Sequence, residues 1–548
     1  MKRILAATLA ALMLLSLCAC GGEEGGKLSD AVGAPAQTAA PVTTENPSSE
    51  KDNDKEQSVA PSLEPAPETP APVPETPELI ELWRCSDSMQ EWGDNGVKYT
   101  VEWDKVMLLG EDAEKYPRLA KALDRMRSES DTEALDVYFE LADIYTSIEA
   151  DSGFLPELSD RGSLFVRRAD EQILSLVCEF DAYWGGAHPS YGLVCINYAS
   201  KSGRELLIGD VVADWERLPA VLGDILTENY PDMGYEDYET MLSDFLETDY
   251  NWSMDYQGIS FYFNPYDIAP YASGLLEARI WFDDHPELFR DEYLQTPKGG
   301  WAVELPDSYA VDFDAKPNDG KRDKVSVRLS HSEDFYGGDI LIGFNGEEHE
   351  GGYAFDTDSY LVHDGENAWY LYVIGTAEND YRTLYVFDLG GGRAEYVGEL
   401  SATGMPSVWF DDMGLYGELY RAVLTNPGSF ELSTRMNLLG TYSAVKDYAL
   451  DPTNGMPQSE NEYFEIDDET MSIVSKVELS VKMLPDMKSS VLPTGTQFHF
   501  LRTDGGDWIE MRLDDGRECR IELELSDWYC TIGGVSEWEC FEQLYYAG

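Results

Sequence analysis

The chain has 548 residues, 43% of them hydrophobic, and a formal net charge of −65 at pH 7 from 104 acidic and 39 basic residues. This length is enough for three or more domains with sizeable cores. So acidic a surface excludes nucleic acid, whose phosphates need Lys and Arg, and disfavours adhesion to anionic lipid or wall. It favours cationic partners or divalent ions, although the same charge also fits a merely solvated, self-repelling surface.

The first 20 residues have the pattern of a secretion signal. Lys2 and Arg3 form a basic end, and the apolar run that follows, residues 4–17, is too short to span a membrane comfortably. The run ends in Leu17-Cys18-Ala19-Cys20-Gly21-Gly22, which resembles a bacterial lipobox. The resemblance implies a lipid on Cys20 and a place on the outer face of the cytoplasmic membrane. An ordinary signal peptide with incidental cysteines is the alternative.

Residues 21–78 have the composition of a disordered tether. They contain no aromatic residue, ten of the chain's 27 prolines, and many Ala, Glu, Thr and Ser residues. Such a segment cannot bury enough apolar surface to fold, and its prolines keep it extended. We therefore expect it to hold the folded part of the chain away from the membrane.

Residues 79–297 carry a mixed pattern of strands and helices. The segment from Trp83 to Met107 is strand-like, and residues 116–126 and 132–148 have the pattern of two helices. The second helix is expected to bury an apolar stripe, made of Leu135, Tyr138, Leu141 and Tyr145. Further helices are expected near residues 215–226, 237–247 and 285–293, with strands at residues 258–263 and 278–282.

A hairpin is the most distinctive feature of this domain. Two apolar runs between Gln172 and Asn197 flank the segment Tyr183-Trp184-Gly185-Gly186-Ala187-His188-Pro189. Glycine tolerates positive φ, and proline fixes φ and donates no ladder hydrogen bond, so the pattern predicts two strands joined by a tight connection. His188 could contact a ligand beside Tyr183 and Trp184, or it could bond the backbone of the turn and hold the hairpin.

Two blocks in this domain also resemble a known family. Gly185-Gly-Ala-His-Pro189 and Phe263-Asn-Pro-Tyr-Asp-Ile-Ala-Pro-Tyr-Ala-Ser-Gly274 are similar to a domain family of unknown function. That family occurs in the lysozyme-binding RsiV-type anti-sigma factor and in the accessory region of PdaC-type peptidoglycan deacetylases. The resemblance covers about residues 80–295 and implies an α+β domain, with helices on a curved antiparallel sheet. This chain has neither the anti-sigma factor's transmembrane helix nor the deacetylase's metal-binding pattern, so a recognition module is implied.

The rest of the chain is expected to be all β. Within residues 298–490, four short strands between Tyr360 and Leu400 resemble one propeller blade, and we expect an incomplete propeller or a meander. Residues 491–548 resemble a small SH3-like barrel, with Asp515-Gly516 as one of its turns.

No motif for catalysis, a metal or a cofactor is present. The six histidines include no pair at metal-ligand spacing, and there is no nucleophile elbow, phosphate loop or dinucleotide fingerprint. The segment from Asp312 to Gly320 begins like a calcium loop but has Lys316 and Pro317 at positions that need ligands or glycine. The sequence therefore predicts neither an enzyme nor a cofactor, although acid–base catalysis by some pair of carboxylates stays possible.

Cys178 and Cys195 lie at nearly equal distances from the centre of the hairpin. In an antiparallel pair they would be almost opposite each other, which predicts a disulfide if the register agrees. Two reduced, buried thiols are the alternative, since free cysteines are among the most buried residues.

A possible contact surface lies between Pro231 and Tyr250, where there are seven acidic residues and no basic one. Aromatic anchors within an acidic field would suit a cationic protein, and the candidate residues are Tyr235, Glu236, Asp237, Tyr238 and Glu239. The alternative is a solvated helix whose aromatic residues are core. Together the patterns predict a lipoprotein that recognises an envelope component, such as a cell-wall fragment, or a cationic protein such as lysozyme. The second hypothesis is a peptidoglycan-maintenance enzyme or its accessory subunit.

Overall fold

The computed structural model describes residues 76–94, 96–152, 156–231, 238–316, 319–330, 337–410, 417–466, 471–526 and 529–547. Cys20, the tether up to residue 75, and the predicted contact residues Tyr235, Glu236 and Asp237 lie outside these ranges. No helix within the described ranges combines the length and the apolar character needed to cross a membrane.

An eight-stranded sheet contains most of the N-terminal strands, in the order β20-β21-β1-β2-β3-β4-β5-β6. The strands are β1 (Leu82–Gly93), β2 (Gly96–Met107), β3 (Leu158–Ala169), β4 (Ile173–Tyr183), β5 (Ser190–Ala199), β6 (Arg204–Glu205), β20 (Ser407–Phe410) and β21 (Glu418–Val423). The sheet was expected to be antiparallel throughout. This prediction is wrong for one pair of strands, because β2 and β3 run parallel. The long helical connection between them allows this, since parallel neighbours need a crossover.

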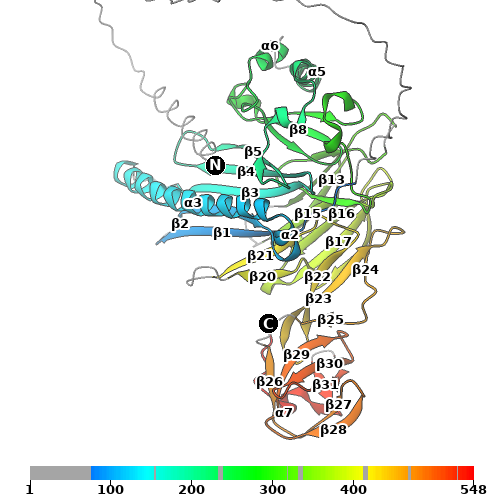
Figure 1. Ribbon diagram of the computed structural model, residues 1–548. Coiled ribbons are helices and arrows are strands. Elements are labelled where there is room, and N and C mark those ends of the chain that lie inside the picture. Colours follow the sequence, from blue (N-terminus) through cyan, green and yellow to red (C-terminus); the bar gives the residue numbers. More distant parts are fainter. Residues whose placement is uncertain are drawn as a thin grey trace, which may run out of the picture. The chain divides into compact units, whose positions relative to one another are not determined.

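That crossover is helix α3 (Pro117–Ser152), which follows the short helix α2 (Gly110–Lys115) and packs along β2 and β3 (Figure 1). Two separate helices were expected here, and the structure has a single helix of 36 residues. The intervening Arg-Ser-Glu-Ser-Asp segment contains neither Gly nor Pro. Its serines do not cap a new helix: Ser128 and Ser130 donate to the carbonyls of Asp124 and Met126, four residues back.

The predicted hairpin is β4 and β5, joined by residues 184–189. Gly185 has a φ of +81°, which confirms the need for glycine in the turn. The predicted disulfide is wrong, and both cysteines are free thiols. Cys178 pairs with Val194 and Cys195 with Val177. Directly paired residues share a face of the sheet and neighbours along a strand alternate, so this register places the two thiols on opposite faces.

A smaller layer packs on the β5 side of the sheet and has its own apolar core. It consists of α4 (Ile208–Val211), α5 (Leu218–Asn229), α6 (Tyr238–Ser243) and a three-stranded sheet of β7 (Asn251–Met254), β8 (Gly258–Phe263) and β9 (Leu276–Trp281). Instead of the closing helix expected at residues 285–293, two 3₁₀ turns follow, Pro286–Leu288 and Asp291–Tyr293.

The next part of the chain forms two sheets that share one core. The first contains β10 (Trp301–Glu304), β15 (Asp356–His363), β16 (Trp369–Thr376), β17 (Arg382–Asp388) and β18 (Glu395–Ser401). The second contains β11 (Val311–Phe313), β12 (Asp323–Leu329), β13 (Gly338–Phe344) and β14 (Glu347–Ala354). The four strands expected between Tyr360 and Leu400 are β15–β18, and they form an antiparallel meander.

The C-terminal strands belong to a twelve-stranded sheet. Its members are β19 (Thr403–Gly404), β22 (Phe430–Asn437), β23 (Thr441–Leu450), β24 (Pro457–Gln458), β25 (Phe464–Glu465), β26 (Ser472–Ser475), β27 (Leu479–Met483), β28 (Lys488–Leu492), β29 (Gln497–Thr503), β30 (Trp508–Leu513), β31 (Glu518–Glu522) and β35 (Phe541–Glu542). A small sheet of β32 (Glu524–Leu525), β33 (Cys530–Ile532) and β34 (Val535–Ser536) precedes helix α7 (Glu537–Cys540). The expected SH3-like barrel is not present as a closed sheet in the described residues.

Candidate functional site

The residues predicted at the hairpin turn have separate partners. The Trp184 indole N–H donates to Asp160 Oδ2 on β3 at 2.9 Å, and Trp184 and Tyr183 are both half-buried. The His188 ring lies 3.9 Å from the Tyr271 ring and is 3.0 Å from the Pro189 carbonyl oxygen. These contacts fit the structural role of His188, that of holding the turn, and they do not join it to Trp184 in one site.

The two sequence blocks that carry the family resemblance meet at this turn. The Tyr271 hydroxyl donates to the Pro189 carbonyl at 2.8 Å. The Asn264 amide accepts from Leu193 N–H at 2.8 Å and donates to Leu193 C=O at 2.9 Å. A Cβ on Gly192 would lie 2.3 Å from the Asn264 amide oxygen, so glycine is required there. Both blocks therefore have a structural function, which is to join β5 to the end of β8.

The acidic segment before Tyr250 is only partly a surface feature. Tyr238 is 1% exposed and belongs to the core of the smaller layer, with Tyr250 and Trp252. Tyr238 is therefore not a surface anchor, and the alternative interpretation of these aromatic residues as core is correct for all three. Glu239 is exposed on α6. Tyr235, Glu236 and Asp237 lie outside the described residues.

A cavity of about 420 Å³ lies elsewhere, lined by β21, β1, β2 and β3 of the eight-stranded sheet and by residues of β10 and β15. Its lining includes two basic residues, Arg84 and Arg421, and seven acidic ones: Asp87, Glu102, Asp104, Glu304, Asp307, Asp356 and Asp358. No short motif in the sequence marks this cavity, because its lining residues extend from position 84 to position 421.

Arg84 is the central cation of this acidic cavity. Its guanidinium donates to Glu304 at 2.7 Å, to Asp358 at 2.5 Å and to the Leu164 carbonyl at 3.1 Å. Glu304 also accepts from Val166 N–H at 2.7 Å. Burial outweighs these contacts and raises the pKa of Glu304 from 4.5 to about 7.

The cavity has more carboxylates than cations that could pair with them. Asp87 pairs with Lys105 and Glu102 with Arg161. Asp104, Asp307 and Asp356 have no ion pair with any cation in the described ranges, since each lies beyond salt-bridge distance of Arg84 and Arg421. Burial raises the pKa of Asp104 despite the nearby Arg84. Asp104 and Asp356 each accept a backbone N–H, from Leu164 at 2.7 Å and from Thr357 at 2.9 Å. A group that brought positive charge into the cavity would thus meet three carboxylates that have no ion pair.

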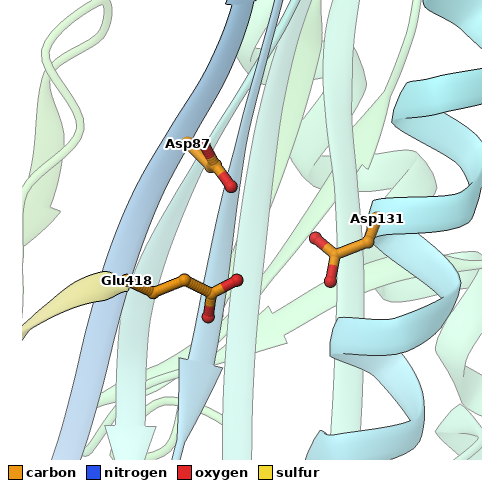
Figure 2. A group of neighbouring side chains, drawn as sticks. All are labelled: Asp87, Asp131 and Glu418. Carbon is orange, nitrogen blue, oxygen red and sulfur yellow. The ribbon is translucent and has the colours of Figure 1, made fainter. Parts of the chain in front are cut away.

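Next to the cavity, three carboxylates turn toward one another, as Figure 2 shows for Asp87 of β1, Asp131 of α3 and Glu418 of β21. Their oxygens lie within 4.8 Å of one another, the only such group of potential metal ligands in the described parts of the chain. The fully buried Lys105 ammonium contacts all three, at 3.2, 3.0 and 2.5 Å respectively. A lysine therefore supplies the positive charge that a metal would bring.

Comparison with known proteins identifies one segment. Residues 216–283 match the family described as "Protein of unknown function (DUF3298)", which confirms the predicted domain of unknown function for this part of the chain. The matched segment includes the Phe263–Gly274 block. No curated protein matches the chain.

Two solved structures are similar to it. A DUF3298 family member from Bacteroides fragilis is 19% identical, with a TM-score of 0.31, and the match covers 39% of this chain and 96% of that one. A DUF3298 family protein from Pseudomonas aeruginosa is 16% identical, with a TM-score of 0.28, and the match covers 40% of this chain and 98% of that one.

Proposed function

We propose that this protein, whose residues 216–283 form a DUF3298 domain, is a bacterial surface lipoprotein that recognises a cationic extracellular protein. The acidic cavity carries the proposal: seven acidic residues line it against two basic ones, and three of the carboxylates have no ion pair among the described cations. A basic side chain entering the cavity would supply the missing positive charge. The formal net charge of −65 would steer a basic protein toward the surface.

A protein cation fits the cavity better than a metal ion does. The cavity carboxylates include no convergent set of three like that around Lys105, and chelation of a divalent ion needs such a set. An ammonium or guanidinium group at the end of a long side chain needs only two or three well-placed oxygens. The resemblance to the lysozyme-binding RsiV-type anti-sigma factor makes a lysozyme-like protein the first candidate.

The anchor is the second part of the proposal. The lipobox-like segment ending at Cys20 supports lipidation, because the thiol sulfur would carry the diacylglycerol. Cells fed a labelled fatty acid should incorporate label into the wild-type protein and none into Cys20→Ser, which should also leave the membrane fraction. A labelled, membrane-bound Cys20→Ser protein would contradict the lipobox interpretation.

Binding can be tested with lysozyme and the chain purified from residue 21 onward. Calorimetric titration should show binding at low salt that weakens as salt rises, since exposed charges are screened over about 8 Å at physiological ionic strength. Asp307→Asn combined with Asp356→Asn removes two exposed cavity carboxylates. We expect the dissociation constant to rise about tenfold, or about 1.4 kcal/mol.

A matched control keeps the cavity intact. Glu347→Gln combined with Glu460→Gln also removes two exposed acidic residues, but neither lines the cavity. This variant should bind lysozyme as the wild type does. Equal weakening by both double variants would mean that overall charge, rather than the cavity, attracts the partner, and no binding at low salt would reject a cationic partner.

A further inference from the structure

The lining of the acidic cavity includes a buried polar group that no described residue satisfies. Ser359 of β15 is 3% exposed, lines the cavity, and has no hydrogen-bond partner for its hydroxyl group among the described residues. A buried hydroxyl group without a partner costs free energy, which a bound ligand can recover. This observation does not depend on the charge of the cavity, and it indicates a ligand that forms a hydrogen bond with Ser359.

Around the cavity, ammonium and guanidinium groups hold different arrangements of carboxylates. The Lys105 ammonium is a compact charge, and it contacts three carboxylates whose oxygens lie within 4.8 Å of one another. The Arg84 guanidinium instead donates to Glu304 through Nη1 and to Asp358 through Nη2. Its planar fork spreads five N–H donors, so it can pair with carboxylates that do not meet at one point. The two kinds of cation therefore suit two kinds of acidic site.

The three carboxylates without an ion pair form a site of the second kind. Asp104 is on β2, Asp307 follows β10, and Asp356 begins β15. The convergent group around Lys105 is the only set of three in the described parts of the chain, and it contains none of these residues. A single ammonium group is poorly placed to contact all three carboxylates at once. A guanidinium group can pair with carboxylates on two of its edges, as Arg84 does in the same cavity.

The free acceptor positions also favour a group with many donors. An ionised carboxylate can accept about four hydrogen bonds, and the backbone N–H groups paired with Asp104 and Asp356 use one position on each. The Ser359 hydroxyl oxygen adds a further acceptor within the same lining. The arginine side chain has five N–H donors in a fixed plane, whereas the lysine ammonium has three and is more strongly hydrated. Arginine can therefore satisfy more of this lining than lysine can.

From these contacts we infer that the acidic cavity selects an arginine side chain of its partner over a lysine side chain. The guanidinium group pairs with the carboxylates that have no ion pair, and it donates to the Ser359 hydroxyl oxygen. This inference rests on the proposed function, because it names the group that the cationic partner inserts into the same cavity. The expected partner is thus a basic protein with a protruding arginine, rather than one whose positive charge comes from lysine alone.

The test compares three capped tripeptides that have glycine on both sides of arginine, lysine or citrulline, which has the shape of arginine without its charge. In calorimetric titration of the chain from residue 21 onward at low salt, the arginine peptide should bind about tenfold more tightly than the lysine peptide, and the citrulline peptide should not bind. Ser359→Ala should weaken binding of the arginine peptide about fivefold and leave the lysine peptide unchanged. The matched control is Ser475→Ala, which removes an equally buried hydroxyl group from β26, outside the cavity, and should bind as the wild type does.

If Ser359→Ala does not fold, Asp307→Asn combined with Asp356→Asn takes its place, and this variant should weaken the arginine peptide about tenfold. The inference is overturned if no peptide binds, if the lysine or citrulline peptide binds as tightly as the arginine peptide, or if neither cavity variant weakens the arginine peptide. Lysozyme titrated in parallel separates the two proposals. Lysozyme binding without selection of arginine would overturn only the inference, and selection of arginine without lysozyme binding would support the inference and reject only the lysozyme-like partner.

Discussion

Lys105 shows how much one residue can organise in this fold. Its ammonium is fully buried and contacts carboxylates from β1, α3 and β21. Lys105→Ala should lower the free energy of unfolding by about 3 kcal/mol, because removing one partner leaves the other charges uncompensated. Added Ca²⁺ should then raise the melting temperature of the variant more than that of the wild type, since three convergent carboxylates become free to bind it.

Lys488→Ala is the control for this prediction, because the Lys488 side chain is 77% exposed and pairs with Asp486 at the surface. It should change stability by less than about 0.5 kcal/mol. Equal effects of the two lysine substitutions in urea unfolding would show that the buried position of Lys105 has no energetic consequence.

Glu304, in the acidic cavity, makes the free energy of unfolding depend on pH. Its pKa is about 7 in the folded protein and 4.5 in an unfolded chain. Between these values the folded state holds a proton that the unfolded state has lost, so the Glu304 contribution to stability is present below pH 4.5 and is lost as pH rises to about 7. Glu304→Gln should remove this part of the slope in urea unfolding measured from pH 4.5 to 7.5. Parallel wild-type and variant profiles would contradict the assignment.

At the scale of elements, the buried face of helix α3 differs from the face that the sequence pattern predicts. The sequence pattern placed Leu135 in the buried stripe, but Leu135 is 45% exposed and Leu141 is fully buried. The observed stripe passes through Ala134 and Val137 instead. Leu141→Ala should cost about 3 kcal/mol and Leu135→Ala less than about 0.5 kcal/mol, because only the first leaves a cavity. Chemical denaturation of both variants checks this, and similar losses would mean that both faces are packed.

At the scale of the whole molecule, the N-terminal sheet depends on residues far along the chain. Strand β21 pairs with β1 through Leu82–Val423, Trp83–Ala422 and Arg84–Arg421. One apolar cluster joins Leu119 of α3 to Tyr360 and Val362 of β15. A fragment of residues 79–297 should therefore unfold without a cooperative transition and be digested rapidly, while residues 76–548 should resist protease. A cooperatively folded fragment would show that the later strands are not needed.

The sequence by itself determined the features that depend on near neighbours. Alternation and a glycine turn identified β4 and β5, and short strands separated by Gly, Asn and Asp identified β15–β18. The Phe263–Gly274 block pointed to a family that the comparison confirms for residues 216–283. These features could be predicted because turn chemistry and strand period are read within a few residues.

Only the tertiary structure decided register and long-range pairing. Cys178 and Cys195 were expected to pair directly across the hairpin. The observed strand register is shifted by one residue, and this shift places the two cysteines on opposite faces of the sheet. Arg84, Glu304 and Asp358 meet although up to 274 residues separate them, and His363 meets Trp301 in the same way. No local pattern marks these positions, because the free energy that brings them together comes from burying apolar surface that belongs to the whole chain.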